Sequence, residues 1–107
     1  MASNIVERVY NGRDNTIDLI LTADGEVVDL SSVQKMVVED KAGGFSEIDS
    51  DSAPAAFDWN TGTPGKVVLS LGAANVPAGN YNCRIVVFDA TTPDGIVWDD
   101  LTIAFFD

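Results

Sequence analysis

Histidine is absent from this sequence of 107 residues, and cysteine occurs once, at Cys83. The usual acyl-transfer triads and zinc sites are built from these residue types, so we expect neither of them here. A single cysteine also excludes an intrachain disulfide, and its place in an apolar pattern predicts a small buried side chain. The composition therefore favours a protein that is not an enzyme and holds no cofactor.

Basic residues are also scarce, with 6 lysines and arginines against 17 aspartates and glutamates and a net charge of -11. This charge repels phosphate backbones and anionic lipid headgroups, so we expect no nucleic-acid and no membrane partner. The sequence has no apolar run near the ~20 residues that span a bilayer, and it does not begin with a secretion-signal pattern. These features predict a soluble protein made in the cytoplasm.

Short alternating segments separated by turns make up the chain, and no stretch has a convincing helical period. We expect one domain over residues 1–107, an all-β antiparallel sandwich of about seven to nine short strands. The expected strands are 4–10, 16–22, 26–30, 33–40, 45–48, 57–59, 66–71, 79–89 and 96–106, with 4–10 as an edge.

The segment Gly79–Asp89 is expected to form the central strand and a hairpin with Ile96–Phe106, through the turn signal Thr91-Thr-Pro-Asp-Gly95. Strand parity then fixes the register, because a slip of one residue would turn the apolar set outward. The predicted opposing pairs are Cys83 with Ile103, Ile85 with Leu101, Val86 with Asp100 and Phe88 with Trp98. A bulge is expected near Asp99, which would otherwise face inward.

This register predicts an exposed apolar patch on the outer face of the hairpin, formed by Val86, Phe88 and Trp98, as a protein interface. The strand 4–10, with Ile5 and Val9, is a second candidate contact, able to pair with a neighbour's sheet edge. Aromatic side chains on a sandwich can also stack on sugar rings. Trp59 and Trp98 therefore keep a carbohydrate-binding or adhesin role open as the alternative.

The acidic segment Glu47-Ile-Asp49-Ser-Asp51 lies near Asp58 in the sequence, and such carboxylates can gather around Ca²⁺. The candidate ligands are Asp49, Asp51 and Asp58. The segment lacks the glycine and the distal glutamate of an EF-hand loop, and a solvated acidic loop is the simpler interpretation.

The motif Ala78-Gly-Asn-Tyr-Asn-Cys83 resembles the penultimate strand of immunoglobulin domains, in which a tyrosine two residues before a cysteine bonds back to the preceding turn. The resemblance implies an immunoglobulin-like sandwich in which Tyr81 has that role and Cys83 the place of the second cysteine. The first cysteine of the family is missing, so its inter-sheet disulfide is absent.

A second resemblance covers roughly the last half of the chain. Its residues are Phe57-Asp-Trp59, Gly65–Leu71, Pro77–Tyr81 and Val86–Trp98. They are similar to small β-sandwich domains of tailed-bacteriophage virion proteins, such as the amino-terminal domain of baseplate upper proteins. This resemblance implies a virion structural protein, a capsid decoration, collar or tail and baseplate component, made in the host cytoplasm. Its partners would be other virion proteins or many copies of itself on a symmetric particle.

Overall fold

The computed structural model describes residues 6–107, with Asp99 described by its backbone alone, and its fold is all-β. The described strands are β1 (Val6–Tyr10), β2 (Ile17–Ile20), β3 (Thr22–Ala23), β4 (Glu26–Val27), β5 (Val33–Asp40), β6 (Ile48–Asp49), β7 (Phe57–Asp58), β8 (Lys66–Leu69), β9 (Gly79–Asp89) and β10 (Thr92–Phe106). Two single 3₁₀ turns, η1 (Pro54–Ala56) and η2 (Gly72–Ala74), complete the list. None of the helices within residues 6–107 has the length and apolar character needed to cross a membrane.

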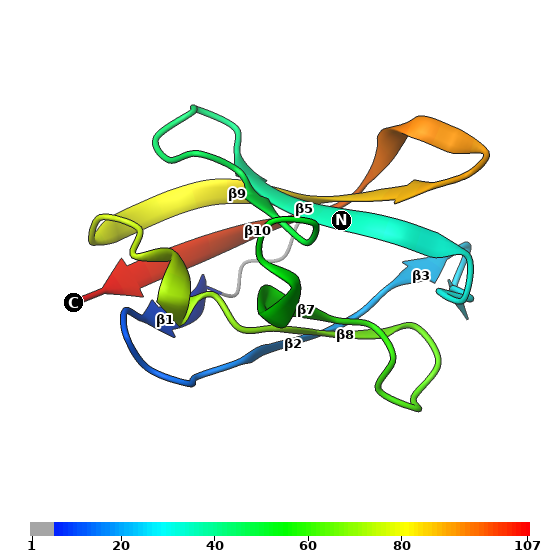
Figure 1. The fold of residues 1–107 in the computed structure, drawn as a ribbon, viewed down its shortest axis with the longest axis horizontal. Helices are drawn as coiled ribbons and strands as arrows, with labels where there is room; N and C mark the ends of the chain where they lie inside the picture. The colour runs from blue at the N-terminus through cyan, green and yellow to red at the C-terminus, as the bar shows by residue number, and fades with distance from the viewer. Residues whose placement is uncertain (1–5) are drawn as a thin grey trace.

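Two sheets face each other as the layers of a sandwich (Figure 1). The larger sheet has the strand order β1-β10-β9-β5-β6, the smaller one has the order β2-β8-β7, and β3 and β4 form a separate hairpin. The expected all-β sandwich is confirmed. Its strands are not all antiparallel, however, because β1 pairs with β10 in parallel. The sheet is mixed since β1 joins it beside the last strand of the chain, a long-range pairing that local patterns do not encode.

The core lies between the two sheets and follows the expected alternation along most strands. Met36 and Val38 of β5 are buried, as their parity predicts, and so are Cys83, Ile85 and Val87 of β9. The smaller sheet contributes apolar side chains from its inner face, and the largest buried side chains there include Ile17, Val67 and Leu69.

The β9–β10 hairpin differs from the predicted register by two residues. Leu101 lies opposite Cys83 and Ile103 opposite Tyr81, so the inward parity is confirmed but the predicted partners are wrong. The turn is tighter than expected because the Asp89 carboxylate accepts backbone N–H groups of Thr91 and Thr92 at 2.9 and 3.0 Å. The chain therefore reverses at residues 90–91, and the Pro-Asp-Gly segment falls within β10.

Two register shifts in β10 absorb the extra residues, one between Thr92 and Ile96 and one between Val97 and Asp99. The second is the expected bulge, and its unpaired residue is Trp98. Because a bulge adds one residue to the strand, residues of the same parity before and after it point to opposite faces of the sheet. Val97 is accordingly exposed, although it has the same parity as the buried Leu101 and Ile103.

The tyrosine contact implied by the immunoglobulin resemblance is present. The hydroxyl of Tyr81 donates a hydrogen bond to the Pro77 carbonyl oxygen at 2.6 Å. The Tyr81 ring also packs edge-on against Phe45 and Phe105, with ring centroids 5.1 and 5.6 Å away. Together these contacts fix the turn that leads into β9.

Candidate protein-contact surface

Val86 points to the outer face of the larger sheet, as predicted, but it is not available to a partner. Only 7% of it is exposed. Val86 lies between Val37 of β5 and Val97 of β10, and Gly95 approaches it so closely that a Cβ on Gly95 would come within 2.6 Å of Val86 Cγ1. The chain's own β10 arm therefore covers this candidate interface residue, which corrects its assignment.

Phe88 lies on the same outer face and is half-buried. The Lys35 ammonium sits 5.1 Å from the centre of its ring, a cation–π contact, and the same ring lies beside Gly95. Phe88 therefore already contacts two residues of its own sheet, Lys35 and Gly95. It does not stand opposite Trp98 as predicted, because β10 is displaced by the register shifts.

Trp98 is turned toward the inside of the molecule by the bulge. It packs against the hydrophobic core as a partly buried side chain, and its indole N–H donates to the Thr22 carbonyl oxygen at 3.1 Å. The predicted outer patch of Val86, Phe88 and Trp98 is thus not assembled. Sequence parity failed here because the unpaired residue of a bulge cannot be read from alternation alone.

The two candidate contact residues of the first strand have different outcomes. Val9 is 1% exposed and belongs to the core, since it pairs in register with the inward-facing Phe105. Its assignment as an interface residue is therefore wrong. Ile5 lies outside the described residues.

The exposed aromatic pair on the outer face of the larger sheet is instead formed by Tyr10 and Phe106. These residues are partners in the parallel register of β1 and β10, and their rings stack with centroids 5.2 Å apart. Tyr10 is 36% and Phe106 41% exposed, and Val6 on the same face of β1 is 47% exposed. The even number of Phe106 already indicated an outward side chain; its pairing with Tyr10 could not be found without the fold.

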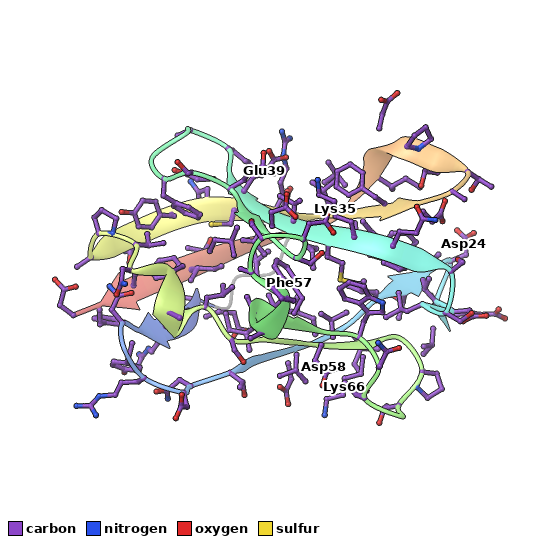
Figure 2. The ribbon with its side chains drawn as sticks, viewed as in Figure 1. Asp24, Lys35, Glu39, Phe57, Asp58 and Lys66 are labelled. Carbon is purple, nitrogen blue, oxygen red and sulfur yellow. The ribbon has the colours of Figure 1, made fainter. Side chains whose placement is uncertain are left out.

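Basic side chains gather on this same outer face. Three of them are neutralised by neighbours: Lys35 pairs with Asp49 at 3.2 Å, Lys41 with Asp100 at 3.0 Å and Arg84 with Glu39 at 2.8 Å. Figure 2 shows Lys35 and Glu39 on this side of β5, with Asp58 and Lys66 on the far side of the smaller sheet. The outer face of the larger sheet is therefore close to charge balance in a strongly acidic molecule.

The three carboxylates considered for Ca²⁺ are not brought together. Asp49 accepts the backbone N–H of Asp51 at 2.7 Å and pairs with Lys35, contacts that lower the pKa of its carboxyl group. Asp58 belongs to β7 in the smaller sheet, where it accepts the N–H of Asn60. Across residues 6–107, no cluster of three or more histidine, cysteine, aspartate or glutamate side chains is arranged to bind a metal ion.

A shallow hollow of about 540 Å³ beside Trp59 is the feature closest to a sugar site. Its lining includes Asp29, Ser31, Trp59, Asn60 and Thr63. The Asp29 carboxylate accepts the Ser31 N–H at 2.9 Å, which lowers the pKa of Asp29. The hollow combines one half-buried ring with carboxylate, hydroxyl and amide groups, the elements that bind saccharides.

Comparisons with family models, with curated proteins and with solved structures find no match for this chain.

Proposed function

We propose that this chain is a non-enzymatic structural protein of a bacteriophage virion, a capsid decoration, collar or tail and baseplate component that acts through protein–protein contacts. The resemblance of its second half to virion sandwich domains motivates the proposal. The observation that carries it is the stacked, exposed pair of Tyr10 and Phe106 on the outer face of the larger sheet. Aromatic side chains of this kind are the residues most enriched at the centres of protein interfaces.

The charge distribution supports a protein partner at this surface. Ion pairs leave the outer face of the larger sheet near neutrality, so docking there does not bring a strongly acidic surface against another protein. The net charge of -11 keeps the chain soluble at the high local concentrations of many symmetric copies. The protein would be made in the host cytoplasm and function in the virion.

Co-sedimentation with assembled particles tests the proposal. The chain should travel with phage particles in a density gradient and be found in them by mass spectrometry. Replacing Tyr10 and Phe106 together by alanine should shift the protein to the soluble fractions. Ile20→Ala, which replaces an exposed apolar side chain on the smaller sheet, should not. Absence of the wild-type chain from the particles would overturn the virion role.

A carbohydrate-binding role is the second candidate, because of the hollow beside Trp59. A glycan array with the isolated protein separates the two functions. Saccharide binding that is lost in Trp59→Ala and retained in the Tyr10 and Phe106 double variant would favour an adhesin module. An array without signal would remove this candidate.

A further inference from the structure

The hollow beside Trp59 is bounded by two short segments that lie far apart in the sequence. One is 27–31, which begins at the end of β4, and the other is 59–65, the connection between β7 and β8. Figure 1 shows both segments at the end of the sandwich that carries the β3–β4 hairpin. The space that they enclose has a volume of about 540 Å³.

Main-chain hydrogen bonds hold the two segments together. The Leu21 N–H donates to the Gly65 carbonyl oxygen at 2.8 Å, and the Val28 N–H donates to the Leu21 carbonyl oxygen at 3.0 Å. The N–H of Lys66 donates to the Thr63 carbonyl oxygen at 3.2 Å, which closes the turn of the second segment. The hollow is therefore formed before a ligand arrives, and binding there requires little ordering of the backbone.

Three polar groups at the hollow have no partner in the protein. The indole N–H of Trp59, the side-chain amide of Asn60 and the hydroxyl of Thr63 form no hydrogen bond in the described part of the chain. The indole N–H of Trp98, in contrast, donates to a main-chain carbonyl oxygen. Across residues 6–107 the one buried side-chain polar atom without a partner is Asn11 Oδ1, so the Trp59 N–H is open to solvent.

The hollow contains an acidic group and no basic one. Asp29 lines it, and no lysine or arginine does. The Asp29 carboxylate accepts the Ser31 N–H, and this contact lowers the pKa of Asp29, so the group is ionised at neutral pH. Lys66, which follows the second segment, pairs with Asp18 at 3.7 Å. In a chain of net charge -11, the hollow therefore repels anionic ligands.

We propose that the hollow beside Trp59 binds a saccharide that carries no acidic group. The apolar face of the sugar would lie against the Trp59 ring, and its hydroxyl groups would bond to Asp29 and Asn60. An apolar ligand would leave these polar groups unpaired. The carboxylate accepts hydrogen bonds from hydroxyl groups and excludes sialic, uronic, sulfated and phosphorylated sugars by charge. The inference rests on the carbohydrate-binding role, the second candidate function, and names its site and ligand class.

Titration of the isotope-labelled chain with methyl glycosides, followed by NMR, tests the site. The chain has two tryptophans, so the spectrum contains two indole N–H signals, which Trp98→Phe assigns. At least one of the methyl glycosides of glucose, galactose, mannose and N-acetylglucosamine should shift the Trp59 signal at millimolar concentration and leave the Trp98 signal in place. A Trp59 signal that none of them shifts would overturn the site.

Asn60→Ala tests the polar contact without disturbing the core, because Asn60 is exposed. The variant should bind the same glycoside about three- to tenfold more weakly, since it loses one hydrogen bond to the sugar. Asn80→Ala, the same change at an exposed position of β9 in the larger sheet, is the matched control and should bind like wild type. Wild-type affinity in Asn60→Ala would contradict the assigned contact.

Asp29→Asn tests the ligand class, because it removes the charge and retains an oxygen that accepts the Ser31 N–H. Wild type should prefer the neutral glycoside to its uronic-acid counterpart at low ionic strength. The variant should reduce this preference about fivefold or more. A uronic acid that binds wild type as tightly as the neutral sugar would overturn the proposed class.

These outcomes separate the inference from the function on which it rests. A glycan-array signal that persists in Trp59→Ala leaves the carbohydrate-binding role in place and shows that the site is wrong. Binding of acidic sugars at Trp59 leaves both the role and the site in place and shows that the ligand class is wrong. An array without signal contradicts the role and the inference together.

Discussion

The indole N–H of Trp98 donates a hydrogen bond to the carbonyl oxygen of Thr22, joining residues 76 positions apart in the sequence. This contact anchors the β9–β10 arm to the β3–β4 hairpin and turns the ring toward the core. Trp98 is therefore a stabilising residue and not a docking residue. Alternation alone placed Trp98 on the outer face, where its replacement would leave stability nearly unchanged. Its position against the core means that its replacement should instead destabilise the fold.

Trp98→Ala should destabilise the fold by about 2–3 kcal/mol, because it removes a large partly buried ring and its hydrogen bond. In a domain of this size the melting temperature should fall by roughly 10 °C. Val97→Ala, at the exposed neighbouring position, is the matched control and should stay within about 0.5 kcal/mol of wild type. A melting temperature unchanged by Trp98→Ala would show that the ring lies outside the core.

Gly95→Ala should also be destabilising, for two reasons that a control can separate. Gly95 has a φ of 79°, and a Cβ there would lie 2.6 Å from both Phe88 and Val86 side-chain atoms. Gly12 has a similar φ of 76° but no neighbouring atom within 4 Å of an added Cβ. Urea unfolding should show a loss of about 1 kcal/mol for Gly12→Ala and about 2–4 kcal/mol for Gly95→Ala. Equal losses would contradict the close approach of the β10 arm to β9.

Tyr81→Phe tests the contact that the immunoglobulin resemblance implied. The change keeps the ring packing on Phe45 and Phe105 and removes only the hydroxyl that bonds to Pro77. We expect a loss of about 1 kcal/mol in the free energy of unfolding. Tyr81→Leu, which also removes the ring contacts, should cost clearly more, and similar values for the two variants would mean that the hydrogen bond alone accounts for the role of Tyr81.

The stability of the protein should fall in alkaline solution because of Cys83. Burial raises the pKa of this thiol to about 12 in the folded state, above its ordinary value of 9.0. The unfolded chain then loses the thiol proton first, so rising pH favours unfolding between these two values. The slope attributable to Cys83 is at most about 1.4 kcal/mol per pH unit. Urea curves at several pH values should show this slope in wild type and its absence in Cys83→Ala; identical slopes would contradict the assignment.

Much of the fold follows from local alternation and turn chemistry. The inward position of Met36 and Val38 in β5, the buried odd-numbered residues of β9 and the bulge near Asp99 were all predictable, because successive side chains of a strand point to opposite faces of the sheet. The tighter turn was harder to predict, since two turn signals compete there. The caps that Asp89 forms on Thr91 and Thr92 prevailed over the Pro-Asp-Gly segment.

The contact surface was only partly predictable because it depends on pairings distant in sequence. The outward parity of Phe106 is local information, but its stacking on Tyr10 requires β1 to lie parallel to β10. The same pairing buries Val9. Likewise, the cover over Val86 comes from a β10 arm whose path is set by two register shifts.

Hydrogen exchange at the β1 amides is the most direct test of the predicted contact between strand β1 and a neighbouring protein. The Asn11 N–H donates to the Phe106 carbonyl oxygen, so the amide of Val9 also faces β10 and those of Arg8 and Tyr10 point away from it. In the dispersed monomer, the amides of Arg8 and Tyr10 should therefore exchange rapidly, whereas the Val9 amide should be protected. On self-association or incorporation into particles, Arg8 and Tyr10 should become protected by at least about tenfold while Val9 changes little. Unchanged rapid exchange at Arg8 and Tyr10 in the assembled state would contradict a contact through this edge.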